Sequence, residues 1–160
     1  MKKIFFLKLV VKKHPLIEDG AEFSLSTVQP VNEPEMESVT HLYGRRYLNN
    51  VSTIVGRNAT GKTTLMTVVV GSLFLFWGDR SIDQTPLNDM LFGDKDIEFD
   101  AYFYGSDSRV YKDTITFSKG AEGKWYVSKE KIQEKKAYTT DSKDKMFDFS
   151  NSKEFVDRST

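Results

Sequence analysis

The chain has 160 residues with 23 basic and 23 acidic side chains, so its formal net charge is zero, and it contains no cysteine. Hydrophobic residues at 39% and charged residues at 29% are typical of a single folded domain and not of a disordered chain. Without cysteine, a disulfide framework and thiolate metal sites are excluded. The apolar segment 65–77 is too short to span a bilayer, so we expect a cytoplasmic globular protein without membrane contact.

The first half of the chain predicts three strands and one long helix. Apolar residues at 4–11 indicate the first strand, and the alternation over 21–28 indicates the second. The β-branched segment 51–55 is typical of a buried strand. Segment 62–77 contains no proline and one glycine, which favours a helix of about four turns that ends before Gly78.

The second half predicts further strands and then a polar tail. Segments 97–104, 109–117 and 125–127 are separated by glycine-containing turns, and they predict an antiparallel meander. The lysine-rich segment 129–138 is interpreted as a short solvated helix, and 139–160 is interpreted as weakly ordered.

One segment carries a phosphate-binding motif. Residues 56–63 read GRNATGKT, which matches G-x-x-x-x-G-K-[ST] at every fixed position. Glycines let successive backbone N–H groups point at a phosphate, and the helix that follows adds the positive end of its dipole. In such a loop Lys62 bridges the β- and γ-phosphates, and the Thr63 hydroxyl ligates Mg²⁺. The predicted nucleotide-binding residues are Gly56, Arg57, Asn58, Ala59, Thr60, Gly61, Lys62, Thr63 and Thr64.

Residues 48–66, LNNVSTIVGRNATGKTTLM, resemble the Walker A region of ABC-type ATPases. The resemblance extends to chromosome-maintenance and recombination-repair ATPases and to bacterial AAA-family proteins similar to overcoming-lysogenization-defect nucleases. Asn58 is typical of this group, whereas Ala59 stands where many members have glycine. The resemblance implies an α/β fold, the N-terminal half of a P-loop NTPase with a mixed sheet and an antiparallel β-subdomain. It also implies ATP and Mg²⁺ as cofactors, ATP-dependent dimerisation, and a role in DNA repair or phage defence.

The catalytic half of such an ATPase is not visible in this sequence. A Walker B element needs four apolar residues before Asp-Glu on a central strand, and the only candidate, Ile97-Glu98-Phe99-Asp100, alternates in polarity. We interpret that segment as an edge strand. No signature motif follows the loop, and both histidines precede it. We therefore predict a fragment of a longer ATPase: an ATP-binding domain over 1–128, a tail over 129–160 that begins a further domain, and no hydrolysis by this chain alone.

Two other functions are open. The first is a nucleotide-gated interaction module that binds ATP without hydrolysing it. The second is a kinase, which would need a carboxylate to activate the acceptor and an arginine-rich lid, and neither is visible. Lysines of the tail could contact nucleic acid, but interleaved acidic residues favour a solvated face. The expected partners are ATP and either a second copy or the remainder of a longer chain, and the preference for ATP over GTP comes from the resemblance.

Overall fold

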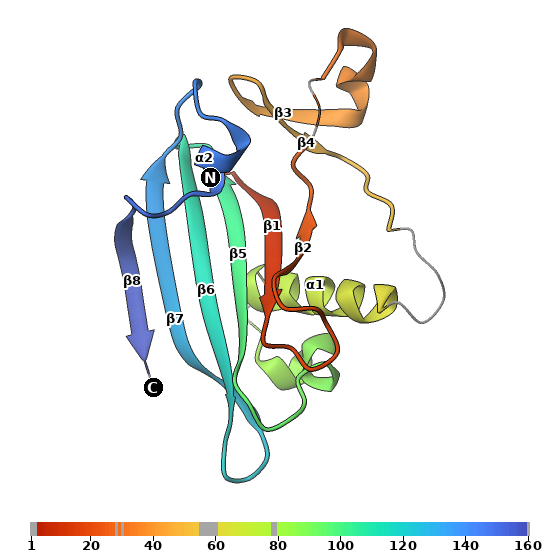
Figure 1. Cartoon of the computed structure of the whole chain (residues 1–160), viewed down its shortest axis with the longest axis vertical. Helices are drawn as coiled ribbons and strands as arrows, with labels where there is room; N and C mark the ends of the chain where they lie inside the picture. Colours follow the sequence, from red (N-terminus) through yellow and green to blue (C-terminus); the bar gives the residue numbers. More distant parts are fainter. Residues whose placement is uncertain (1–2, 28, 30, 55–60, 78–79, 160) are drawn as a thin grey trace.

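The computed structural model describes residues 3–27, 29, 31–54, 61–77 and 80–159. Its main element is a six-stranded antiparallel sheet in the order β2-β1-β5-β6-β7-β8 (Figure 1). The strands are β1 (Ile4–Lys12), β2 (Ala21–Ser24), β5 (Ile97–Gly105), β6 (Arg109–Lys119), β7 (Trp125–Lys136) and β8 (Lys153–Ser159). The predicted antiparallel meander is confirmed, because β5 pairs with β6 and β6 pairs with β7 in antiparallel register.

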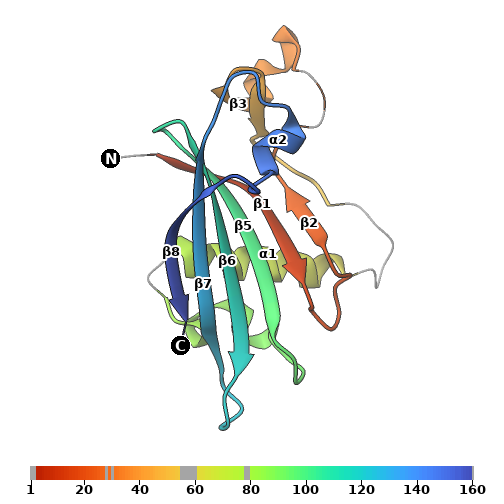
Figure 2. The same cartoon turned by 60° about the vertical axis from the view of Figure 1, so that its left-hand side comes forward.

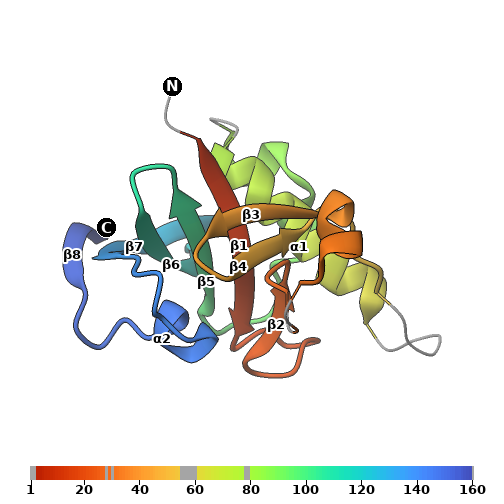
Figure 3. The ribbon, with the colours of Figure 1, turned by 90° about the horizontal axis from the view of Figure 1, so that it is seen from above.

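Helices and a hairpin cover the two faces of this sheet. On one face lie α1 (Lys62–Trp77) and the short 3₁₀ helices η2 (Ile82–Gln84) and η3 (Pro86–Asp89). Over one end of the other face lie the hairpin of β3 (Val39–Tyr43) and β4 (Arg46–Asn49) and the helix α2 (Lys143–Phe147). The 3₁₀ helix η1 (Glu33–Ser38) precedes the hairpin. Figure 2 and Figure 3 show α1 and α2 on opposite sides of the sheet, and we name the two faces the α1 face and the α2 face.

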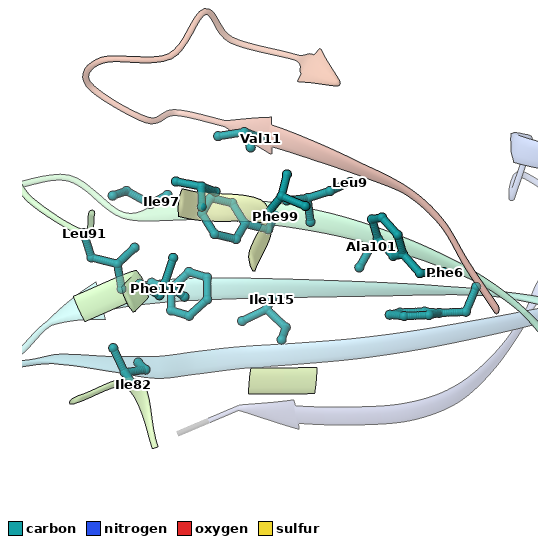
Figure 4. Packing of buried hydrophobic residues seen from close by; sticks show 14 residues of the cluster. Phe6, Leu9, Val11, Ile82, Leu91, Ile97, Phe99, Ala101, Ile115 and Phe117 are labelled. Carbon is teal, nitrogen blue, oxygen red and sulfur yellow. The ribbon is translucent and has the colours of Figure 1, made fainter. Parts of the chain in front are cut away.

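Alternation along β5 gives the sheet a core on each face. Ile97 and Phe99 are fully buried on the α1 face, where they pack with β1, β6 and the residues of α1, η2 and η3 (Figure 4). Tyr102 and Tyr104 point to the α2 face and pack with the hairpin and with residues around α2. Because a fully buried large apolar side chain contributes roughly 1.5–3 kcal/mol, both faces stabilise this strand.

The predicted helix over 62–77 is confirmed, with the same bounds as α1. Three consecutive valines in its middle lower the intrinsic helix propensity, so the helix depends on packing against the sheet. Val68 and Val69 are buried in that contact, whereas Val70 is 39% exposed. α1 is therefore apolar both toward the sheet and on its outer surface.

Gly71 lets η3 pack directly against α1. A Cβ atom at this position would lie 2.7 Å from the backbone nitrogen of Leu87 and 2.9 Å from its Cβ. We therefore expect Gly71→Ala to lower the free energy of unfolding by roughly 1–3 kcal/mol through overpacking, although alanine is the better helix former. Urea unfolding measures the change, with Val70→Ala at an exposed position of the same helix as the control. A gain in stability for Gly71→Ala would show that the contact is looser than described.

The expectation of an α/β fold with a mixed sheet, as in the N-terminal half of a P-loop NTPase, is wrong. Every strand pair of the sheet is antiparallel within the described part of the chain. Strand β1 precedes α1 and β5 follows it, and the two lie side by side in this sheet, but they run antiparallel and so do not form the parallel pair of a βαβ unit. Residues 51–54 are not a strand and Val51 is 83% exposed, so the buried strand predicted over 51–55 is also wrong as far as the described residues reach. The strand that follows α1 pairs instead with β1 and β6.

Strand β5 is central, whereas the sequence predicted an edge strand for residues 97–100. It lies between β1 and β6, and Asp100 in its middle is only 3% exposed. Polar alternation is compatible with this central position because lysines of both neighbouring strands, Lys12 and Lys112, pair with the Asp100 carboxylate. The polarity of Asp100 therefore does not indicate an edge strand, because lysines on both neighbouring strands pair with its charge.

The tail is part of the sheet, so the predictions of a solvated helix over 129–138 and of weak order over 139–160 are wrong. Residues 129–136 are the second half of β7, and α2 and β8 follow. Cross-strand ion pairs join Glu134 to Arg109, Glu130 to Arg158 and Lys131 to Glu154. The alternating charges therefore find partners on neighbouring strands instead of along a helix, and the sheet continues through the boundary between 128 and 129.

Candidate functional site

The predicted phosphate loop lies only partly within the described structure. Gly56, Arg57, Asn58, Ala59 and Thr60 lie outside the described residues. The remaining four residues, Gly61, Lys62, Thr63 and Thr64, lead into the first turn of α1. Gly61 has a φ of 76°, in the left-handed region that favours glycine, and its carbonyl accepts a hydrogen bond from the Leu65 N–H at 2.9 Å. The second glycine of the motif therefore stands where the backbone requires one.

The first turn of α1 presents groups that suit an anion. In a helix of 16 residues the first N–H groups have no partner within the helix, and the dipole makes this end positive. The first turn contains no acidic residue that would repel a phosphate. Lys62 is half-buried and Thr63 is exposed, and Thr67 Oγ1 donates to the Thr63 carbonyl at 2.8 Å.

A cavity of about 620 Å³ opens beside this helix start. It is lined by β2, by the end of β4, by the segment that leads to the phosphate loop and by α1, through Glu22, Phe23, Ser24, Asn49, Val51, Ser52, Thr53, Ile54 and Leu65. Segment 51–54 therefore forms a cavity wall and not the buried strand that was predicted. The volume lies in the range of small-molecule sites, and the hydroxyl and amide side chains provide hydrogen-bonding groups.

Asp100, the acid nearest to a Walker B residue in the sequence, lies on the α2 face. Its Oδ2 pairs with Lys12 Nζ at 2.7 Å and with Lys112 Nζ at 3.1 Å, and its Oδ1 accepts a hydrogen bond from Thr114 at 2.6 Å. Burial raises the pKa of Asp100, but these hydrogen bonds and charges outweigh it and hold the pKa below its ordinary value. Its neighbour Phe99 points to the opposite face, so the sheet separates Asp100 from α1. Asp100 is an internal ion-pair residue.

A second buried acid, Asp113, lies on the opposite face, the α1 face, and it was not predicted as a site residue. Asp113 on β6 is 7% exposed and lines a cavity on this face together with several aromatic rings. The signal in the sequence is an acid at an inward position of the strand, where Ile115 and Phe117 belong to the buried core. Alternation identifies the face of such a residue, but only the structure reveals the cavity beside it.

Comparisons with known proteins do not assign the chain to a family. No protein-family model, no curated protein and no solved structure matches it. The resemblance of residues 48–66 to Walker A regions therefore depends on the motif itself. Within the described ranges of the chain, no helix combines the length and the apolar character needed to cross a membrane.

Proposed function

We propose that the chain binds Mg·ATP through residues 56–64, at the N-terminal end of α1. The observation that carries this proposal is the junction of motif and helix: Gly61 is left-handed, and α1 begins at Lys62. A phosphate-binding loop of this type needs a glycine turn that delivers its lysine and threonine to the start of a helix. The cavity beside Leu65 adds room for the nucleoside.

Each residue of the site has a separate role in this proposal. Backbone N–H groups of the loop and first turn surround the phosphates, Lys62 neutralises the β- and γ-phosphates, and Thr64 contacts an inner phosphate. The exposed Thr63 offers a hydroxyl oxygen, a hard ligand that suits Mg²⁺. Among the described residues no group of three histidine or carboxylate side chains could hold a metal ion. Phosphate oxygens and water would therefore complete the coordination of the ion.

The wider role rests on the resemblance of residues 48–66 alone. It points to a cytoplasmic ATP-binding domain of a bacterial ABC-type or AAA-like ATPase that acts in DNA repair or phage defence.

Titration with a fluorescent ATP analogue in the presence of Mg²⁺ tests the nucleotide site. Displacement by ATP, but only weakly by GTP, would support the preference taken from the resemblance. If no displaceable binding is detected, the site assignment is wrong.

We expect ATP hydrolysis by this chain to equal that of a Lys62→Ala control. Phosphoryl transfer needs an acid that completes the metal shell and a residue that positions water. Asp100 cannot serve, because Lys12 and Lys112 hold it on the α2 face. Steady-state phosphate release at saturating Mg·ATP checks the expectation. Turnover above the control that is abolished by Asp100→Asn would contradict it.

A second candidate, a nucleotide-gated interaction module, is supported by the outer surface of α1. Met66, Val70, Phe74 and Trp77 are between 38% and 53% exposed. Their spacing places them along one side of the helix, and we name them the α1 stripe. Contiguous exposed apolar surface of this kind marks a contact surface, which suits a second copy or the remainder of a longer chain. Because α1 begins at the phosphate loop, a bound nucleotide would act on the same helix.

We expect the protein to self-associate at micromolar concentration through the α1 stripe. Sedimentation velocity over a concentration series measures this. Phe74→Asp should shift the protein toward monomer, because a carboxylate in the stripe would have to be desolvated in the contact. Leu16→Asp, at a 64% exposed apolar residue in the turn between β1 and β2, should leave the association unchanged. A wild-type monomer at all concentrations would exclude a second copy as the occupant of the stripe.

A further inference from the structure

An aromatic cavity of about 350 Å³ lies on the α1 face, between the C-terminal end of α1 and strands β6, β7 and β8. Its aromatic lining comes from Phe76, Trp77, Phe103, Tyr111 and Phe155. Phe103 meets Phe76 and Trp77 edge-on, with ring centroids 5.5 Å and 5.8 Å apart. Figure 2 shows this end of α1 behind β7 and β8, at the opposite end of the helix from the phosphate motif.

A buried carboxyl group lies in the wall of this aromatic cavity. Asp113 is 7% exposed, and its Oδ1 is buried without a hydrogen bond from any described residue. Arg109 on β6 and Arg158 on β8 are engaged elsewhere, Arg109 with Glu134 and Arg158 with Glu130, each at 3.0 Å. Buried carboxylates normally have a donor, so Asp113 is an exception that calls for an explanation.

The surroundings of Asp113 favour its neutral form. Burial is the main cause that raises the pKa of Asp113 to about 7. The charges of Glu130 on β7 and Asp100 on β5 add to the increase, and that of Arg158 on β8 opposes it. The carboxyl group therefore changes charge near neutral pH, and a cation placed against it would favour the ionised form.

We propose that the aromatic cavity binds a small organic cation, a protonated primary amine on an aromatic or short apolar group, with its ammonium hydrogen-bonded to Asp113. An ammonium supplies the donor that the buried carboxyl group needs, and aromatic rings attract cations. The Tyr111 hydroxyl does not fill this role, because it donates to Asp107 at 2.7 Å. An anion would be repelled by Asp113, and a neutral apolar ligand would leave the carboxyl group unpaired.

The size of the cavity limits the ligand. A volume of about 350 Å³ is near the lower end for small-molecule sites. It suits a single-ring amine and is too small for a nucleotide. The proposal is independent of the nucleotide site, and a Lys62→Ala protein should bind the amine as the wild type does.

Titration of the full chain with benzylammonium, followed by ¹⁵N NMR, tests the proposal. At about pH 8 we expect saturable shifts in β6, in β7 and in the last turn of α1. Benzyl alcohol has the same shape without the charge, and it should bind at least about tenfold more weakly. Asp113→Asn should lose this preference. Asp157→Asn removes an exposed carboxylate of β8 that pairs in register with Lys131, and it should keep the preference.

The pH dependence gives a second readout that does not need a variant. When the pH is lowered from about 8 to about 5.5, benzylammonium stays charged but Asp113 becomes protonated. The affinity for benzylammonium should therefore fall by at least about tenfold. Carboxyl ¹³C NMR should also show a lower pKa for Asp113 when the amine is bound. Three results would each overturn the proposal: no saturable binding of benzylammonium, equal binding of benzyl alcohol, or unchanged affinity in a folded Asp113→Asn protein.

Discussion

Replacing Lys62 with alanine is expected to weaken Mg·ATP binding at least about tenfold while the fold survives. The ammonium is the fixed cation of the motif, and a charge-assisted hydrogen bond to phosphate contributes about 1.5–3 kcal/mol. Lys62 is half-buried at the first position of α1 and does not belong to either hydrophobic core. Titration with a fluorescent ATP analogue measures the affinity, and circular dichroism measures the fold.

The control for this substitution is Lys124→Ala. The Lys124 side chain is 86% exposed in the turn between β6 and β7, so its removal changes the net charge by the same amount without touching the site. The control should bind the nucleotide as the wild type does. Equal affinity of the Lys62→Ala protein and the wild type for the nucleotide would show that residues 56–64 do not form the nucleotide site.

Replacing Asp113 with asparagine is expected to stabilise the protein at about pH 8 by roughly 2–4 kcal/mol and to change its stability little at about pH 4. The pKa of Asp113 is raised to about 7 by burial, above the ordinary value of 3.8. Between these two values the folded protein holds a proton that the unfolded chain has lost. The contribution of Asp113 to the stability is therefore highest at low pH and falls as the pH rises through the window from about 4 to about 7.

Urea unfolding of the two proteins at a series of pH values tests this dependence. Comparing the variant with the wild type at each pH cancels the contributions of all other titrating groups. The difference in the free energy of unfolding should increase between about pH 4 and about pH 7 and then become constant. A difference that is the same at every pH would mean that Asp113 is ionised with an ordinary pKa in the folded protein.

A destabilising buried acid is informative about function. The hydrophobic core on the α1 face would be more stable with an apolar residue at position 113, because an unpaired buried carboxyl group costs free energy. Groups of this kind with strongly shifted pKa values cluster at functional sites. The two sites proposed for this protein lie at opposite ends of α1: the proposed nucleotide site at its start and the proposed amine site at its end.

For the candidate sites, a local pattern in the sequence predicted the backbone at the start of α1. The spacing of Gly61, Lys62 and Thr63 predicts a turn into a helix start, and the structure has the helix beginning at Lys62. Asp113 could be placed on an inward face from its sequence neighbours, but its missing donor could not be predicted. That property depends on residues of β7, β8 and α1, which are distant in the sequence and come together only in the folded sheet.

For the fold, helix and strand periodicities are local properties of the chain, so they predicted the bounds of α1, the strands β5 and β6 and the start of β7. The pairing of β1 with β5 and of β7 with β8 could not be predicted in this way, because it joins segments that are brought together only by the folded sheet. The central position of β5 is compatible with its polar residues because Lys12 and Lys112 of the two neighbouring strands form ion pairs with Asp100. Residues 129–136 suit a strand because their charged side chains have partners on β6 and β8. The exposed segment 51–54 is an example of a predicted strand that has no such partners among the described residues. A β-branched segment becomes a buried strand only where neighbouring strands offer hydrogen bonds, and among the described residues the sheet around α1 is built from β1, β5 and β6 instead.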